Sequence, residues 1–251
     1  MALESTAAED VSCFHFPGHN QGKAVPSSLS NLIGAGAFLH DLPELPELDD
    51  LFYPKGVILD AQNRAAQLFG SSKMWFLVNR RTCGIQAAVM GTCCPGDYIV
   101  VPRNCHISVI SALILSAMCK VSSMFAIPYI SVIVDLTRLM MRTSGSMTVF
   151  QARRLSKVLS SLTQSSMLHM AGGLVDADKV SHCIQLLQSS SPSYLLLSSL
   201  DAARAQLSEN GKYFDDSVAM ALETKDQLMV IPGVSVLDLP CFASDFPAIY
   251  P

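Results

Sequence analysis

Four side chains, Thr82, His106, Asp135 and Lys157, have the chemistry that a catalytic site could use. A lysine amine can bond covalently to a carbonyl compound, an imidazole can move a proton, and a carboxylate can hold a positive charge. Each also has an ordinary structural role. Lys157 could be a surface charge, His106 could cap a helix or fill the core, and Asp135 could cap a turn after the apolar run 132–134. The residue types alone leave these alternatives open.

The eight cysteines favour reduced thiols over a metal site. None of them forms a CxxC pair, and no second cluster of metal ligands follows. Structural zinc sites are typically built from such closely spaced pairs. We therefore expect no bound metal, and thiols that stay reduced inside a cell.

The composition predicts a sizeable core and excludes several partners. Of the 251 residues, 50% are hydrophobic and 15% are charged, and the formal net charge is -4, which gives no basic surface for nucleic acid. Residues 1–12 carry acidic side chains and lack the apolar core of a secretory signal, so we expect the cytoplasm. Pro128 and several serines interrupt the apolar stretch 107–134, which favours buried elements over a membrane span.

Apolar runs alternate with helical patterns along the chain. Short continuous apolar runs are typical of buried strands, and apolar residues three and four positions apart are typical of amphipathic helices. Strands that alternate with helices predict a mainly parallel sheet with helices on both faces. We expect strands over 75–78, 98–101 and 132–135, and helices over 60–69, 82–90, 106–115, 176–188 and 194–207.

Several long strings resemble one family, the pyridoxal-phosphate (PLP) decarboxylases of ornithine, lysine and arginine. These strings are 14–19 (FHFPGH), 41–50 (DLPELPELDD), 102–106 (PRNCH), 157–169 (KVLSSLTQSSMLH) and 190–194 (SSPSY). Long strings of this kind are far more specific than a short pattern. The resemblance implies a fold type I enzyme with a large α/β domain, a smaller C-terminal domain and an active site built across a homodimer.

The resemblance also implies a role for each of the four residues. Lys157 would bond to PLP, Asp135 would hold the ring nitrogen, and His106 would stack on the ring. Thr82 would contact the phosphate, which such enzymes hold at a helix N-terminus. The substrate would be a basic amino acid.

The chain departs from the family pattern near two of these residues. Ser156 replaces the histidine that precedes the family lysine. The family's phosphate turn, N-G-S/T-T-x-G, corresponds to residues 79–84, where Arg80 replaces the glycine and Arg81 the small hydroxyl residue. Arginine can pair with phosphate. However, glycine lets the backbone approach the phosphate closely, so we interpret Arg80 as damage more than adaptation.

The largest departure follows Asp135, where the family continues E-A-H-G-A-H-F. With a permitted codon choice, the bases for residues 137–154 read in a shifted frame as E-A-H-D-A-H-F-R-F-H-D-S-L-P-S-S-A. Our hypothesis is that this segment is the family's active-site strand and loop translated out of frame. Sequencing the transcript tests it, because many codon choices forbid that reading. Residues 117–131 also stand where the family has a much longer βαβ stretch.

We therefore expect an α/β chain that holds part of a PLP-transferase fold type I large domain, with a mainly parallel sheet, a disrupted centre and a missing or truncated C-terminal small domain. The expected parts are a tail (1–13), the first part of the major domain (14–118), the disrupted segment (119–156) and the rest of the major domain (157–251).

Three functional readings remain open at this stage. The family activity is PLP-dependent decarboxylation of ornithine, lysine or arginine, by a homodimer. The alternative is a catalytically inactive paralogue or splice product that pairs with a full-length subunit as a heterodimer. The third is a product that does not fold stably, because 127–134 is apolar, uncharged and rich in β-branched residues.

Overall fold

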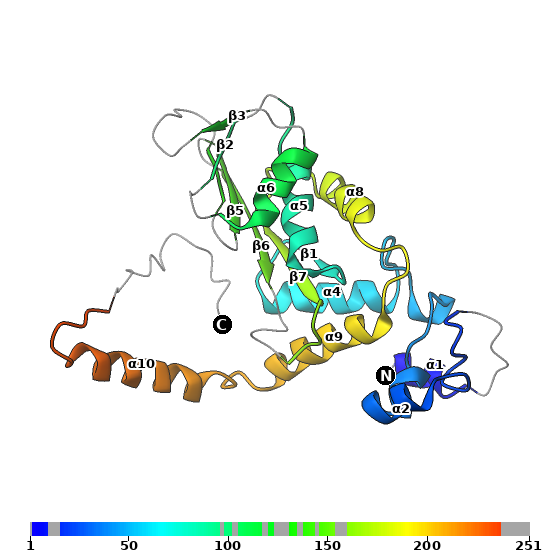
Figure 1. Ribbon diagram of the computed structural model, residues 1–251. Coiled ribbons are helices and arrows are strands. Elements are labelled where there is room, and N and C mark those ends of the chain that lie inside the picture. The colour runs from blue at the N-terminus through cyan, green and yellow to red at the C-terminus, as the bar shows by residue number, and fades with distance from the viewer. Residues whose placement is uncertain are drawn as a thin grey trace.

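A seven-stranded sheet forms the centre of the molecule in the computed structural model (Figure 1). The strand order is β1-β7-β6-β5-β4-β2-β3. The strands are β1 (Lys73–Leu77), β2 (Tyr98–Val100), β3 (Lys120–Ser122), β4 (Ser131–Val134), β5 (Arg138–Thr143), β6 (Ser146–Arg153) and β7 (Ser166–Ala171). The structure describes residues 2–9, 16–95, 98–101, 105–116, 120–122, 131–134, 138–143, 146–153 and 160–236.

The sheet is mixed, which corrects the prediction of a mainly parallel sheet. Among the described strands, β2 pairs in parallel with β3 and β4, whereas the other four pairings are antiparallel. The physical reason is the length of the connections. Only a few residues join β4 to β5 and β5 to β6. Parallel neighbours need a crossover of about a dozen residues or more, so short connections force hairpins.

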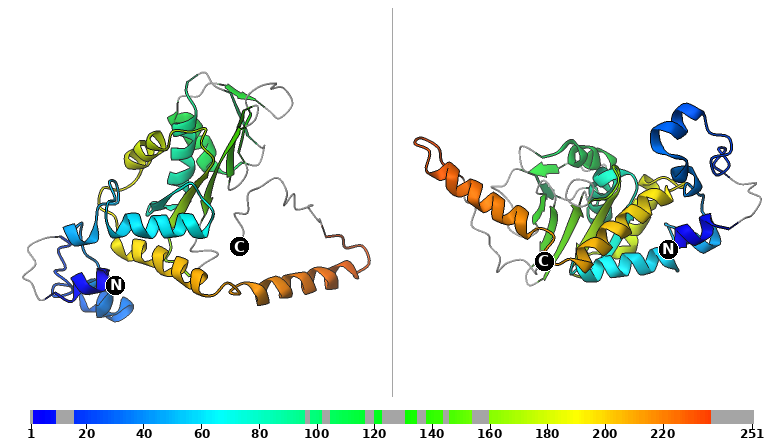
Figure 2. Two further views of the ribbon diagram at one scale, coloured as in Figure 1. Left: turned by 180° about the vertical axis from the view of Figure 1, so that it is seen from behind. Right: turned by 90° about the horizontal axis from the view of Figure 1, so that it is seen from below.

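Helices cover both faces of the sheet near β1 and β7 (Figure 2). Alternate residues of β1 point to opposite faces, as strand geometry requires. Trp75 and Leu77 join a core with α5, α6 and α8, whereas Met74 and Phe76 join a second core with α4 and α9. These helices are α4 (Val57–Leu68), α5 (Arg80–Thr92), α6 (Ile107–Leu115), α8 (Ala177–Leu187) and α9 (Tyr194–Glu209).

The remaining helices lie outside this sandwich. The N-terminal segment holds α1 (Ala2–Ala7), α2 (Ser27–Ile33), α3 (Ala35–Leu39) and the 3-10 turn η1 (Pro46–Leu48). The last described helix, α10 (Asp215–Met229), extends away from the sheet and buries none of its residues (Figures 1 and 2). No helix within the described ranges is both long and apolar enough to cross a bilayer.

Two glycines set how closely α5 packs. A β-carbon on Gly84 would lie 2.6 Å from Leu77 Cδ1, and one on Gly91 would lie 2.8 Å from Val180 Cγ2. Both distances are shorter than real carbon contacts, so α5 rests on β1 and α8 at a separation that only glycine permits. The sheet and α8 thereby fix the position of the first turn of α5.

Asp49 links two of the strings that carried the family resemblance. Its carboxylate accepts hydrogen bonds from the backbone N–H groups of Asp50, Lys55, Gly56 and Ile58, at 2.8–3.1 Å. Burial raises the pKa of this carboxyl group, but the four N–H donors lower it more, and the net pKa lies below its usual value. The Tyr194 hydroxyl donates to the Asp49 carbonyl, which ties α9 to the start of α4.

Candidate functional site

The turn between β1 and α5 is the best-defined part of the candidate site. Asn79 is the N-cap residue of α5, but its side chain makes no capping hydrogen bond. The Asn79 amide instead donates to the Leu187 carbonyl, at 3.4 Å. Thr82 lies half-buried in the first helical turn. An uncapped helix N-terminus with a hydroxyl beside it is a favourable place for an anion.

Arg80 holds this turn in a conformation that favours glycine. Its φ angle is +65°, in the left-handed region, and its backbone N–H donates to the Gln164 carbonyl at 2.9 Å. A left-handed residue with a β-carbon costs about 1–2 kcal/mol. The backbone therefore has the shape expected at a position where the family resemblance implies glycine, although this chain carries arginine there. The Arg80 side chain is exposed.

Burial keeps the thiol in this turn protonated. Cys83, the residue after Thr82, is 3% exposed and belongs to the core between α5 and the sheet. Desolvation raises the pKa of the thiol to about 12. Cys83 is therefore a neutral packing residue at ordinary pH, not a nucleophile.

His106 caps helix α6. The N–H of Ser108 donates to His106 Nδ1 at 3.1 Å, and the Ser108 hydroxyl lies 2.9 Å from the same nitrogen. The ring itself is exposed. The structure thus confirms the capping alternative for this residue. A stacking role stays a prediction, because capping uses Nδ1 and leaves the ring face available.

The two turns lie at the same edge of the sheet. The chain of pairings makes β1, β2, β4 and β6 run in one direction. The carboxyl ends of β1 and β2 are followed by the first turns of α5 and α6, two helices that pack against each other. Thr82 and His106 therefore come to one edge, although no hydrogen bond joins them in the described part of the chain. Asp135 and Lys157 lie outside the described residues.

The sequence analysis did not identify three polar residues that lie beside the first turn of α5. The Gln164 carbonyl accepts from Arg80, and Gln188 Oε1 accepts from the Val78 N–H at 3.0 Å. Within the described part of the chain, Gln188 Nε2 and the buried Ser166 Oγ have no hydrogen-bond partner. The sequence carries no signal for these contacts, because they join residues far apart in the chain. Buried polar atoms without partners are unusual, and these two lie beside the end of β1 that leads into α5.

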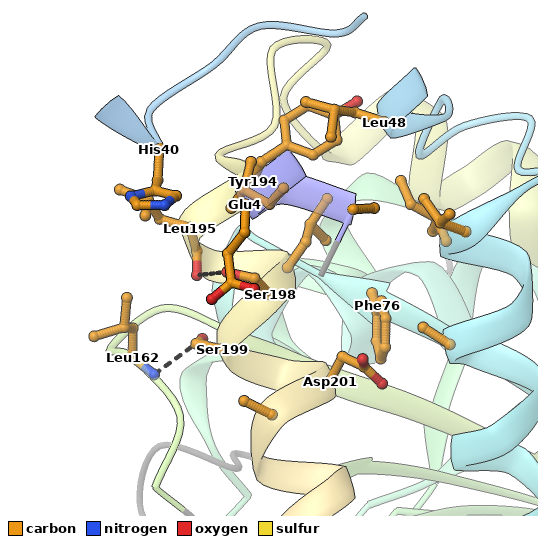
Figure 3. A pocket seen from close by; sticks show the side chains of 17 residues that line it. Glu4, His40, Leu48, Phe76, Leu162, Tyr194, Leu195, Ser198, Ser199 and Asp201 are labelled. Carbon is orange, nitrogen blue, oxygen red and sulfur yellow. Dashed lines mark hydrogen bonds between the residues drawn. The ribbon is translucent and has the colours of Figure 1, made fainter. Parts of the chain in front are cut away.

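A separate cavity of about 560 Å³ lies on the other side of the sheet, between α1, α4 and α9 (Figure 3). Its walls are mostly apolar, and its polar groups are engaged. Asp201 pairs with Arg204 at 2.7 Å, Ser199 accepts from the Leu162 N–H at 3.1 Å, and Ser198 donates to the Leu195 carbonyl at 3.1 Å. Neither Thr82 nor His106, the two predicted site residues that the structure describes, lines this cavity, so we assign it no role in the candidate site.

The fold and these turns define an α/β chain in which two strand-to-helix turns lie at one edge of the sheet, and comparison with known proteins specifies the family. The family model "Orn/Lys/Arg decarboxylase, major domain" matches residues 1–122 and 123–239. The chain therefore belongs to the Orn/Lys/Arg decarboxylase family, which confirms the resemblance seen in the sequence.

A curated relative agrees with this assignment, and solved structures share the fold. The arginine decarboxylase of Bacillus subtilis (strain 168) is 30% identical over 293 positions, which cover 92% of this chain and 60% of that protein. The constitutive lysine decarboxylase of E. coli has the same fold, with a TM-score of 0.76 at 18% identity, over 90% of this chain and 43% of that one. The lysine decarboxylase of Francisella novicida gives a TM-score of 0.75. The chain thus spans about three fifths of the curated relatives or less.

Proposed function

We propose that this chain carries the PLP-dependent decarboxylation of a basic amino acid, which releases CO2 and leaves the amine. Family membership supports the reaction class. Relatives named arginine, lysine and ornithine decarboxylases support a basic amino acid as the substrate. The observation that carries the proposal is the β1–α5 turn. Its first residue has a glycine-like backbone, and its helix N-terminus is uncapped beside Thr82.

The described residues of this turn fit a phosphate group. The Asn79 side chain makes no capping hydrogen bond at the start of α5, and Thr82 adds a hydroxyl in its first turn. Among the described residues, the nearby Ser166 Oγ and Gln188 Nε2 are buried without a hydrogen-bond partner. We assign the phosphate to Thr82 and the first turn of α5, and the ring face to His106. Asp135 would hold the ring nitrogen, and Lys157 would attach the cofactor. When bound, PLP supplies the electron sink for loss of the carboxyl group.

The test is covalent capture of PLP. The full chain is incubated with PLP, reduced with borohydride and mapped by mass spectrometry, beside Lys157→Ala and the control Lys179→Ala, an exposed lysine on α8. We expect PLP on the peptide with Lys157 in the wild type and in the control, but not in Lys157→Ala. Release of CO2 from arginine, lysine and ornithine then ranks the substrates. Labelling spread over many lysines, unchanged by Lys157→Ala, would refute the site.

A second candidate is an inactive family subunit that pairs with a full-length member. Two observations favour it. Arg80 stands in the glycine position of the phosphate turn, and the family model breaks between residues 122 and 123, within the sheet-forming part of the chain. Co-expression with a tagged full-length relative tests it. Copurification in a fixed ratio, together with absence of Lys157 labelling, would favour this candidate over the enzyme.

A further inference from the structure

The C-terminal end of helix α8 is tied to the β1–α5 turn by the side chain of Gln188. Gln188 is the C-cap residue of α8 and is only 7% exposed. Its Oε1 accepts a hydrogen bond from the N–H of Val78, which is also buried. The next residue, Asn79, donates its side-chain amide to the carbonyl of Leu187, the last residue of α8. Two successive residues that lead into α5 are therefore held by the end of one helix.

Helix α8 runs beside β1 so that its C-terminal end reaches this turn. The Ser181 hydroxyl, near the start of α8, accepts from Trp75 Nε1 at 2.9 Å, and Gln188 reaches Val78 at 3.0 Å. A helix rises about 10 Å from residue 181 to residue 188, and a strand also rises about 10 Å from residue 75 to residue 78. The helix and the strand thus advance in step, and α8 supports β1 up to the residue where the strand ends.

The Val78 N–H depends on this acceptor because Val78 lies just beyond the paired part of β1. Leu77 pairs with Ser166, and the described register of β1 with β7 ends there. A buried backbone N–H without an acceptor is costly, so the Gln188 oxygen takes the place that a neighbouring strand would otherwise fill. Within the described part of the chain, Gln188 Nε2 has no hydrogen-bond partner. The polar contribution of this side chain there rests on its oxygen.

We propose that Gln188 is a positioning residue for the phosphate turn, residues 79–84. This inference rests on the proposed function, in which the first turn of α5 receives the phosphate of PLP. The backbone N–H groups at a helix N-terminus can receive an anion together only if the turn before the helix is held in one conformation. Gln188 holds Val78 just before this turn, and the Gln164 carbonyl holds the Arg80 N–H at 2.9 Å. Gln188 acts through the Val78 backbone and not by touching the cofactor.

The experiment compares PLP with pyridoxal, which has the same aldehyde but no phosphate. The full chain is incubated with either compound, reduced with borohydride and mapped for labelling of Lys157. Gln188→Met keeps the length of the side chain but removes the amide oxygen. The matched control is Gln185→Met on the same helix, which removes a hydrogen bond of 3.0 Å to the Phe52 carbonyl, outside the turn.

We expect Gln188→Met to capture PLP about tenfold less readily than the wild type, because the loss of one hydrogen bond in a buried place corresponds to about that factor. Its capture of pyridoxal should be unchanged, since pyridoxal has no phosphate for the turn to receive. Gln185→Met should match the wild type with both compounds.

Hydrogen–deuterium exchange without PLP gives a second result that needs no cofactor. The Val78 amide should exchange at least about tenfold faster in Gln188→Met than in the wild type, and at the wild-type rate in Gln185→Met. Urea unfolding of each variant shows whether the fold is retained. If Gln188→Met does not fold, Gln188→Asn replaces it, because asparagine keeps the amide but is shorter by one methylene group.

The outcomes separate this proposal from the proposed function. If the wild type captures PLP on Lys157 and Gln188→Met captures it equally well, the role of Gln188 is refuted while the proposed function stands. Equal losses of PLP and pyridoxal capture would show a general structural role and would also refute it. If the wild type captures no PLP, the proposed function fails, and the exchange rates alone decide whether Gln188 holds the turn. Unchanged exchange of the Val78 amide contradicts the positioning role in either case.

Discussion

The two helices that follow the strands of the candidate site differ in how their N-termini are capped. At the start of α6, His106 places its own ring nitrogen against the Ser108 N–H and closes the helix. At the start of α5, the Asn79 amide donates to the Leu187 carbonyl instead of capping the helix, and Arg80 adopts a left-handed backbone. A helix N-terminus gains about 1 kcal/mol from a cap. The turn that forgoes this stabilisation is the one that the family resemblance assigns to the phosphate.

The first prediction tests whether close packing beneath the first turn of α5 holds this turn in position. Gly84→Ala would place a β-carbon 2.6 Å from Leu77 Cδ1, in a core where Leu77 is fully buried. We expect a loss of about 1–3 kcal/mol in the free energy of unfolding, measured by urea denaturation. Gly173→Ala is the matched control, because nothing lies within 4 Å of its β-carbon. An equal effect in both variants would show that close packing does not position this turn.

The buried thiol of the same turn predicts a loss of stability at high pH. The pKa of Cys83 is raised from 9.0 to about 12, so the neutral thiol stabilises the fold fully below pH 9, and this contribution is lost as the pH rises from 9 toward 12. We expect the wild type to lose up to about 1.4 kcal/mol per pH unit in this range relative to Cys83→Ala. Urea unfolding at pH 8 and pH 10, in reducing buffer, measures the difference.

The exposed Cys94 provides the control for that experiment. Cys94→Ala should keep the pH dependence of the wild type. If Cys83→Ala also keeps it, the alkaline loss comes from other groups and the Cys83 thiol is not responsible.

Most elements of the β1–α5–β2–α6 region were predictable because their signals are local. The apolar runs at 75–78 and 98–101 and the helical spacing at 82–90 and 106–115 match β1, β2, α5 and α6 within a few residues. The same holds for α4, α8 and α9. Each pattern reflects burial of one face or of a whole strand, which the residue order records directly.

Other features depend on contacts that the order of residues does not record. The backbone of Arg80 is set by the Gln164 carbonyl, and the antiparallel pairings of β5 follow from two short connections. Helix α10 was not predicted, because its apolar residues do not fall on a buried face. For the site, sequence reasoning placed Thr82 and His106 at the correct helix starts. It did not reveal the polar atoms of Ser166 and Gln188.

The α6 turn tests whether the role of His106 is structural. His106→Ala removes the acceptor of the Ser108 N–H, and we expect a loss of about 1 kcal/mol in unfolding free energy. Asn is a good N-cap, so His106→Asn should restore most of that stability. PLP capture on Lys157 distinguishes the predicted stacking role of His106 from its capping role. Weaker capture in His106→Asn at normal stability would show that the imidazole ring itself is needed. Equal stability of His106→Ala and the wild type would contradict capping.

The smallest and most informative change is at Arg80. Arg80→Gly removes the β-carbon from a residue with φ +65°, which relieves about 1–2 kcal/mol of strain, but glycine loses about 0.5–1 kcal/mol in chain entropy. We therefore expect a net gain of a few tenths to about 1 kcal/mol. Arg80→Ala is the control, because it removes the guanidinium but keeps the β-carbon, and it should give no gain.

PLP capture by Arg80→Gly and Arg80→Ala tests how the arginine side chain affects phosphate binding at this turn. If the side chain fills the space of the phosphate, both variants capture PLP more readily than the wild type; if the guanidinium pairs with the phosphate, both capture less. We expect the first result, because a side chain larger than glycine at this position occupies space that lets the backbone approach a phosphate closely.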